Sequence, residues 1–260
     1  MKLTYIALLS LLFFTACDTD LDQFPTNIAA SSELENYEGI LNAAYFYQIG
    51  SVTPMAIMGD FRADNAIMDE SPFDEFDMFT PNLTAMEDQF FGPFYTAMYR
   101  SILSANNVIE NSDDATEVGE AQFLRALSYF KLVRVFGDVP VNLSATPSTT
   151  DESILLRRPI ANVYNDVIIA DLQSAISALD NSRIASGRAS EIAARALLGK
   201  VYVQQGNFSA AESELAAVVD GAAAAEIPGA AHPAYRAAGQ RVGTQGHDQL
   251  SGHRQPGHAG

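Results

Sequence analysis

The sequence predicts an all-α fold of packed helix pairs, joined in places by long irregular loops. Apolar residues recur at helical spacing in several segments of residues 31–221, and capping residues or Gly and Pro breaks bound these segments. One segment, residues 120–136, is apolar on several sides and therefore needs more than one neighbouring helix. Residues 198–215 add the alternation of small and large side chains that is typical of a two-helix repeat.

Two helices are expected in the first half of the chain. Ser31 and Ser32, followed by acidic residues, are typical of a helix N-terminus, and this helix is expected to end near Gly50. Its apolar stripe consists of Leu34, Tyr37, Leu41 and Tyr45. A Gly-Pro break precedes the second helical segment, residues 94–110.

Three helical segments follow in the second half. Residues 120–136 have the strongest helical pattern, with polar side chains at every third position, and the sequence Gly-Asp-Val-Pro at residues 137–140 ends it. Residues 162–179 place their apolar side chains on one stripe. Residues 190–205 follow a Ser-Gly turn and form the next predicted helix.

The last two predicted helices carry the spacing of a tetratricopeptide unit. Its residues are Leu198, Gly199, Tyr202, Gly206, Phe208, Ala211 and Leu215. The small residues let two antiparallel helices approach closely, and Tyr202 and Phe208 are expected to fill the space between them. We interpret these rings as core rather than as a ligand site. One unit cannot bury its own face, so residues 120–137 and 162–179 are expected to stack against it.

Cys17 is the only cysteine, and its surroundings predict an anchor. The apolar run of residues 3–14 suits the core of a signal peptide and is too short for a membrane span. Thr15 and Ala16 suit a signal peptidase, and a cysteine at the cleavage point is the bacterial lipoprotein arrangement. We therefore predict a signal peptide at residues 1–16 and acyl chains on Cys17. The alternatives are a secreted protein with a chance cysteine and an N-terminal membrane helix.

Residues 55–82 lack clean periodicity and are rich in Asp, Phe and Met, which predicts a long loop or short irregular pieces. A candidate ligand-binding patch lies here, because aromatic faces pack against apolar sugar faces while carboxylates and amides bind hydroxyl groups. Its residues are Asp64, Asn65, Phe73, Asp74, Phe76 and Phe79. The alternative is that these rings pack into the helical scaffold or against a partner protein.

The side-chain chemistry of residues 1–220 argues against an enzyme. This stretch contains no histidine, and its one thiol is expected to be acylated, which excludes histidine-based triads and the usual zinc sites. Carboxylates crowd the same loop: Asp60, Asp64, Asp69, Glu70, Asp74, Glu75 and Asp77. A pair of them could cleave glycosides, but a solvated acidic loop is the simpler interpretation. Oxygen-rich loops suit calcium, yet EF-hand spacing is absent, so no metal or cofactor is expected.

Composition sets further bounds. Without the signal peptide about 240 residues remain, enough for one sizeable domain or two small ones. A hydrophobic content of 48% can supply a core. The formal charge of −17 disfavours nucleic acid and anionic surfaces as partners. A single cysteine gives no disulfide within the chain, so packing must stabilise it.

Residues 221–260 differ in composition from the rest. They hold all four histidines, and they carry three arginines against two carboxylates in a chain of net charge −17. Such a segment buries too little apolar surface to fold, so disorder is expected. One interpretation is a natural linker; we favour an out-of-frame translation of GC-rich DNA. The histidines are widely spaced, and a metal site on them is not expected.

Several motifs resemble those of one known family. They are Cys17 with Leu-Asp-Gln-Phe-Pro at residues 21–25, residues 119–130 (GEAQFLRALSYF), residues 132–140 (LVRVFGDVP), Arg158-Pro159, Val163-Tyr164, Asp171-Leu172, Gly-Arg-Ala-Ser at residues 187–190, and the helix at residues 194–206. Together they cover most of residues 17–220 in the family's order. The chain resembles the N-terminal portion of the RagB/SusD family, nutrient-binding outer-membrane lipoproteins of Bacteroidetes.

The resemblance implies a fold, a location and a task. Members are all-α proteins built on tetratricopeptide-like helix pairs. They sit on the outer face of the outer membrane, cap a SusC-like, TonB-dependent transporter and deliver glycans or other nutrients to it. For this chain the resemblance implies a SusD-like helical domain at residues 17–220, a lipid anchor at Cys17, and a transporter and a glycan as partners. The acidic residues after Cys17 look like a surface-export signal.

The chain also departs from the family pattern. Members are usually much longer, and their glycan sites often use aromatic platforms, whereas this chain contains no tryptophan. A tetratricopeptide-type scaffold that binds a protein and no small molecule is the alternative function.

Overall fold

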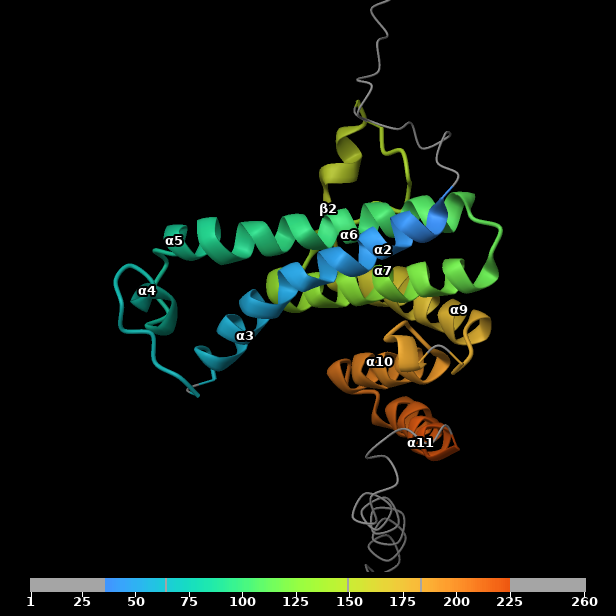
Figure 1. Ribbon diagram of the computed structural model, residues 1–260. Helices are drawn as coiled ribbons and strands as arrows, with labels where there is room; N and C mark the ends of the chain where they lie inside the picture. Colours follow the sequence, from blue (N-terminus) through green and yellow to red (C-terminus); the bar gives the residue numbers. More distant parts are fainter. Residues whose placement is uncertain (1–35, 64, 149, 183, 225–260) are drawn as a thin grey trace, which may run out of the picture. The chain divides into compact units, whose positions relative to one another are not determined.

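The computed structural model describes residues 36–63, 65–148, 150–182 and 184–224 (Figure 1). The helices in these ranges are α2 (Tyr37–Gln48), α3 (Val52–Asp60), α4 (Asp74–Asp77), α5 (Thr84–Met86), α6 (Gly92–Asn111), α7 (Ala115–Phe136), α8 (Ile160–Val163), α9 (Ala170–Ala178), α10 (Glu191–Gln204) and α11 (Phe208–Ala224). Short 3₁₀ turns lie at Ile49–Ser51, Glu152–Leu155 and Ile184–Ser186, and π-helical turns at Glu87–Phe91 and Tyr164–Ile169. The all-α prediction is confirmed.

The two strands are short. β1 (Val139–Pro140) and β2 (Arg157–Arg158) pair antiparallel, with Val139 opposite Arg158. This ladder closes the loop that leaves the end of α7. Gly137 stands at that end with a φ of +70°, a backbone conformation that glycine adopts without steric cost.

Capping side chains fix where the helices begin. The side chain of Asn36 accepts a hydrogen bond from the Gly39 amide at the start of α2, and Ser190 accepts one from the Ala193 amide at the start of α10. Asp114 caps α7, so that helix begins five residues earlier than the periodicity predicts. The predicted cap at residues 31–32 lies outside the described residues, as do Cys17 and the signal peptide.

The helices stack in the order that a repeat architecture requires. α6 and α7 pack against each other, α2 packs on both of them, and α9 packs on the other side of α7. α10 packs against α9, and α11 packs against α10. α7 therefore contacts helices on two sides, as its several apolar faces predict. Segments α8, Tyr164–Ile169 and α9 follow one another without a break, in agreement with the helix predicted at residues 162–179.

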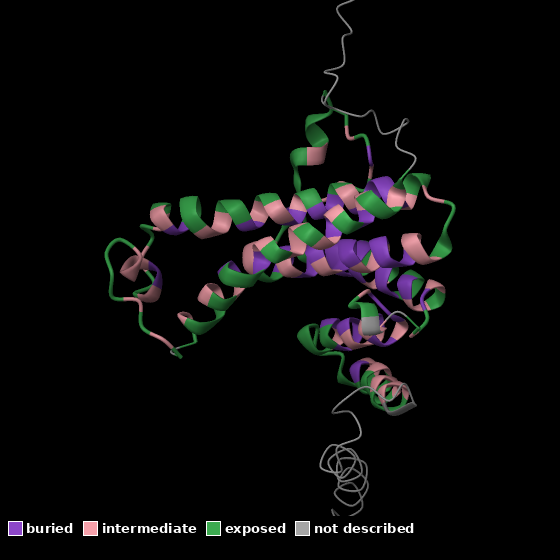
Figure 2. Ribbon diagram, viewed as in Figure 1, coloured by how far each residue is buried: buried purple, intermediate pink, exposed green. Residues whose placement is uncertain are grey.

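The main core lies where α6, α7, α9 and α10 face one another, and the buried positions in Figure 2 follow these facing sides. Its largest fully buried side chains include Phe94, Met98, Ile102, Tyr129, Phe130, Leu132, Ile168, Leu172 and Leu198. These side chains come from helices that are far apart in the sequence. Their packing fixes the position of the end of α7 relative to α6 and to the segment that precedes α6.

The predicted close approach of the last two helices is confirmed. A Cβ added at Gly199 would lie 2.7 Å from Cγ of Leu215, so α10 and α11 touch at this glycine. Tyr202 is partly buried against the main core, which agrees with its interpretation as a core residue. The prediction for Phe208 was wrong: it is the first residue of α11 and 69% exposed, and Leu215 covers Gly199 instead.

The segment predicted as a loop is partly helical. α3 extends to Asp60. Pro54 does not prevent this helix, because it lies in the first turn, where the amide hydrogen that proline lacks is not needed. From there to α5 the chain is irregular apart from the single turn of α4, as predicted. The predicted domain boundary at residue 221 falls within α11, and residues 225–260 lie outside the described part of the chain, so the origin of that tail stays a prediction.

Candidate functional site

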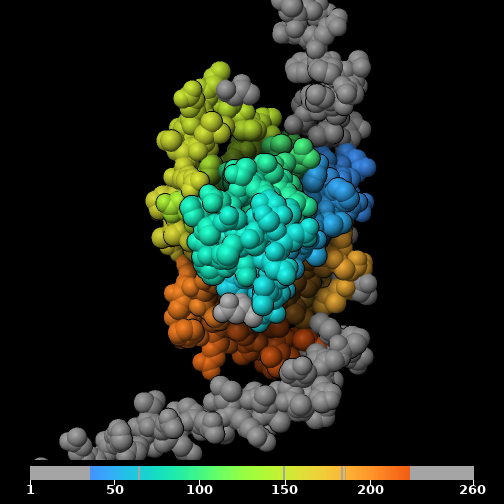
Figure 3. Space-filling view, turned by 90° about the vertical axis from the view of Figure 1, so that its left-hand side faces the viewer, coloured from blue at the N-terminus to red at the C-terminus, as the bar shows by residue number. Residues whose placement is uncertain are grey.

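The candidate site lies in the segment between α3 and α6, at one end of the helices. Figure 3 looks onto this end, and the cyan and teal surface that faces the reader belongs to this segment. Of the predicted ligand residues, Asp64 lies outside the described residues. Asn65 is exposed, and its amide donates to the Asp60 carbonyl over 3.1 Å. One carboxylate oxygen of Asp74, Oδ1, is buried without a hydrogen-bond partner among the described residues.

The three phenylalanines of the predicted patch have different surroundings. Phe76 is buried and meets the ring of Phe91 edge-on, with 5.6 Å between centroids. Phe73 is half-buried and meets Phe90 in the same way. Phe79 is 65% exposed. The three rings therefore do not form one platform: two of them follow the packing alternative, and Phe79 alone faces outward.

Arg62 is a further candidate site residue, which is not among those predicted from the sequence. Its guanidinium carbon lies 4.1 Å from the centre of the Phe76 ring and 4.0 Å from that of Phe79, so the cation is stacked between the two rings. The signal was present in the sequence, because Arg62 is the only cation in residues 55–82. Its contacts with Phe76 and Phe79, however, could not be predicted from the sequence, because they depend on how the loop folds back.

A cavity of about 360 Å³ opens beside this stack, and we call it the arginine pocket. Its apolar lining consists of Met58, Phe76, Leu83, Phe91, Val135 and Phe136. Its charged lining consists of Arg62 from the loop and Arg134 from the last turn of α7. Among the residues that the structure describes, no carboxylate lines this pocket.

A second cavity, of about 320 Å³, adjoins the first, and we call it the tyrosine pocket. The two share Phe91 and Phe136 as a common wall. The tyrosine pocket adds the ring of Tyr95 and four polar side chains, Glu87, Thr96, Asp138 and Arg157. This mixture of ring faces with convergent charged and hydroxyl groups is typical of a site for a polar small ligand.

Hydrogen bonds hold the walls of the tyrosine pocket. The Tyr99 hydroxyl donates to the Pro140 carbonyl over 2.6 Å, and the Ile160 amide donates to Asp138 Oδ1 over 2.8 Å. The ring of Tyr95 meets Phe136 edge-on at 5.3 Å. These contacts join α6, the end of α7 and the β1–β2 connection into one wall.

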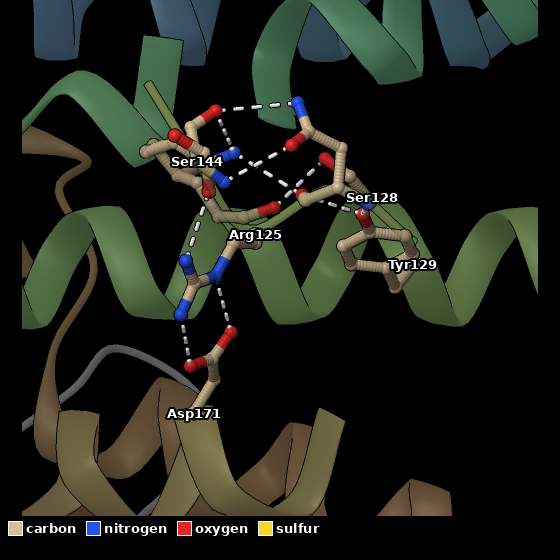
Figure 4. A network of polar contacts seen from close by, with 8 residues as sticks. Arg125, Ser128, Tyr129, Ser144 and Asp171 are labelled. Atoms are coloured by element: carbon tan, nitrogen blue, oxygen red, sulfur yellow. Dashed lines mark hydrogen bonds and ion pairs between the residues drawn. The ribbon is translucent and has the colours of Figure 1, made fainter. Parts of the chain in front are cut away.

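A buried polar network supports this wall from within (Figure 4). Arg125 donates two hydrogen bonds to the Asp171 carboxylate, at 2.7 and 2.8 Å, and a third to Asn106 Oδ1. Asn106 in turn donates to the carbonyls of Asn142 and Ser144, just beyond β1. Burial raises the pKa of the Asp171 carboxyl, while the hydrogen bonds and charge of Arg125 act in the opposite direction. The network links α6, α7 and α9, and we interpret it as structural.

Lys131 forms a second internal polar contact. Its ammonium donates to Gln48 Oε1 and Ser51 Oγ, both at 2.8 Å, and so ties α7 to the end of α2. Burial lowers the pKa of Lys131 to about 8.

The described residues show neither a metal-binding cluster nor a membrane-spanning helix. No group of three or more His, Cys, Asp or Glu side chains there could hold a metal ion. No helix in the same ranges has the length and apolar character that crossing a membrane requires.

With this geometry in view, comparison with known proteins identifies the family. A family model described as SusD-like, starch-binding associating with outer membrane, matches residues 17–203. The chain belongs to the SusD-like family. Among curated SusD-like relatives, protein P2 of Formosa agariphila is 29% identical over 84% of this chain and 46% of its own length. A SusD-like protein of Bacteroides ovatus is 29% identical over 80% of this chain and 40% of its own length.

Solved SusD-like structures share the fold. A SusD superfamily protein from Bacteroides thetaiotaomicron has a TM-score of 0.61 at 20% identity, over 73% of this chain and 48% of its own. A protein described as a laminarin-binding SusD-like protein has a TM-score of 0.54 at 26% identity, over 70% of this chain and 42% of its own. The chain thus spans less than half the length of the relatives named here.

Proposed function

We propose that this SusD-like chain is a non-enzymatic, cell-surface lipoprotein that binds a glycan and delivers it to a TonB-dependent outer-membrane transporter. The observation that carries the proposal is the pair of adjoining pockets, which together offer aromatic faces and convergent polar groups at one end of the helices. A laminarin-binding SusD-like protein of known structure, 26% identical to this chain, supports a glycan as the ligand class.

The lining suits a sugar chain. The apolar faces of sugar rings pack on aromatic side chains, and their hydroxyl groups pair with carboxylates, hydroxyls and guanidinium groups. Tyr95 and Phe136 supply rings in the tyrosine pocket, beside Glu87 and Asp138. Phe79 supplies an outward-facing ring beside the arginine pocket. A chain of two or more sugars would span the shared wall at Phe91.

The location completes the proposal. Acyl chains on Cys17 would hold the protein at the outer membrane, with which the family is associated by its description. The acidic residues behind Cys17 support export to the outer face of that membrane. Replacement of Cys17 with Ala should move the protein from the membrane fraction to the soluble fraction. If the variant stays in the membrane fraction, the anchor proposal is wrong.

A tetratricopeptide-type protein scaffold is the second candidate, and one observation favours it. In α11, Phe208 and Val219 are 69% and 52% exposed, and Leu215, which covers Gly199, is still 38% exposed. Exposed apolar faces of this kind bind other proteins or further helices of a repeat.

Affinity electrophoresis separates the two candidates. The full chain migrates through gels that contain laminarin, dextran, alginate, polygalacturonate or carrageenan, next to the Phe79→Ala and Phe208→Ala variants. These two phenylalanines have similar exposure, 65% and 69%, but Phe79 contacts Arg62, which lines the arginine pocket. We expect at least one glycan to retard the wild type and Phe208→Ala, and to retard Phe79→Ala less. No product should be released from that glycan. Retardation by none of the five favours the scaffold.

A further inference from the structure

We propose that the glycan bound by this chain is acidic, and that its carboxylate or sulfate group binds to Arg62 and Arg134 in the arginine pocket. The inference rests on the proposed function and names the charge of its ligand. It follows from three features of the pocket. These are its charge, the absence of ion pairs to its two arginines within the described residues, and the aromatic rings that the arginines contact.

The charge of the pocket opposes that of the protein. The chain contains 32 acidic and 15 basic residues, yet the described residues that line the arginine pocket include two arginines and no carboxylate. The adjoining tyrosine pocket differs, since Glu87 and Asp138 there outnumber Arg157. A local cationic site of this kind selects anionic groups, while the net charge of −17 repels polyanions from the rest of the surface.

Ion pairing varies among the arginines that the structure describes. Arg125, Arg188 and Arg195 each form an ion pair with an Asp or a Glu, whereas Arg100, Arg157 and Arg158 form none there. Within the described ranges, neither Arg62 nor Arg134 forms an ion pair with a carboxylate. Their guanidinium groups stand in an otherwise apolar lining, where an anion from outside would supply the missing partner.

Stacking holds both cations in place without using their donors. Arg62 lies between Phe76 and Phe79, and the guanidinium carbon of Arg134 lies 5.3 Å from the centre of the Phe130 ring. Such contacts occupy the flat faces of a guanidinium and leave the N–H groups along its edge free to donate in plane. Carboxylate and sulfate both accept two parallel hydrogen bonds from that edge. Because Arg62 is already held between two rings, its side chain loses less entropy on binding.

The size of the pocket agrees with this ligand. A cavity of about 360 Å³ lies in the range of small-molecule sites, roughly 300 to 1,000 Å³. The apolar lining fits the ring of one sugar unit, and the shared wall at Phe91 and Phe136 lets the next unit enter the tyrosine pocket.

The test compares neutral, carboxylated and sulfated glycans on three arginine variants. Affinity electrophoresis of the full chain uses laminarin and dextran as neutral probes, alginate and polygalacturonate as carboxylated probes, and carrageenan as the sulfated probe. The variants are Arg62→Gln and Arg134→Gln, with Arg100→Gln as the matched control. Arg100 is exposed and stacks on the Tyr47 ring at 6.0 Å, but it lines neither pocket.

We expect an acidic glycan to retard the wild type and Arg100→Gln equally. Arg62→Gln and Arg134→Gln should each raise the dissociation constant about tenfold, since each removes a charge-assisted hydrogen-bonded contact. The carboxylated and sulfated arms identify which anion binds. Added salt should weaken retardation of the wild type.

Three results would overturn the inference. If only neutral glycans retard the protein, the bound glycan is not acidic, while the proposed function stays intact. Retardation by an acidic glycan that neither arginine variant changes places the anion elsewhere. Retardation by no glycan overturns the inference together with the proposed function on which it rests.

Discussion

The guanidinium of Arg62 lies 4.0 Å from the ring centre of Phe79, on the outer side of the loop that follows α3. Phe79 adopts a φ of +58°, a left-handed conformation that is uncommon for a bulky residue. Strained backbone of this kind clusters at functional sites, and here it holds an exposed ring against a cation that lines the arginine pocket. The contact between Arg62 and Phe79 thus connects the positive φ of Phe79 with the proposed ligand site.

The two rings that enclose Arg62 should contribute very differently to stability. Phe76 is 4% exposed, and its replacement with Ala should lower the free energy of unfolding by about 3–5 kcal/mol. Phe79 is 65% exposed, and Phe79→Ala should change that free energy by less than about 0.5 kcal/mol. Urea unfolding followed by circular dichroism measures both. Equal losses in the two variants would contradict the assignment of Phe76 to the scaffold and of Phe79 to the surface.

The buried pair of Arg125 and Asp171 should be costly to break. Asp171→Asn leaves the Arg125 charge buried without a full partner, and the free energy of unfolding should fall by about 3–5 kcal/mol. The matched control is Arg195→Gln, which removes a more exposed pair with Glu191 and Glu214 and should cost less than about 1 kcal/mol. Thermal unfolding of the two variants is the measurement, and a similar small loss in both would argue against a structural role for the network.

Lys131 should give the stability a distinct dependence on pH. Its pKa is lowered to about 8 in the folded protein, so between that pH and its ordinary value the unfolded state binds more protons. The free energy of unfolding should therefore rise with pH in this window. Below about pH 8, Lys131 is protonated in both states, so it adds no further dependence on pH. Relative to Lys131→Met, the wild type should gain about 1 kcal/mol between about pH 7.5 and 9.5, allowing for partial solvent screening. Parallel pH profiles of urea unfolding test this, and identical slopes would contradict it.

Gly50 should set the approach of α2 and α3 to α6. A Cβ there would lie 2.5 Å from the Cβ of Ala97, which cannot rotate away. Gly50→Ala should therefore destabilise the fold by about 1–3 kcal/mol, and it should be partly rescued by Ala97→Gly in the double variant. Gly59 is the control, because a Cβ there meets nothing within 4 Å; Gly59→Ala should stabilise α3 by up to about 1 kcal/mol. An additive double-mutant cycle would show that the two sites do not touch.

The sequence allows the helices to be predicted because their signals are local. The periodicity of residues 94–110, 120–136 and 162–179 and the cap at Ser190 are present within single segments. The error at Phe208 has a physical reason. Helical spacing places a residue near an interface, but the close approach at Gly199 decides that Leu215 rather than Phe208 covers it.

The pockets could not be predicted in the same way, because their walls come from distant parts of the chain. Met58 belongs to α3, Leu83 precedes α5, and Arg134 and Phe136 end α7. The predicted patch lies in the loop that contributes Arg62 and Phe76 to the arginine pocket, yet it grouped Phe73, Phe76 and Phe79 by spacing alone. Which ring turns outward depends on Phe90 and Phe91, with which the first two pack.

The most direct test of the account records the arginine side-chain Nε–H signals of the ¹⁵N-labelled full chain by NMR, during titration with the glycan that gives the strongest retardation. We expect the signals of Arg62 and Arg134 to shift in a saturable way, while those of Arg100 and Arg195 stay in place. Saturable binding that leaves Arg62 and Arg134 unchanged would contradict it.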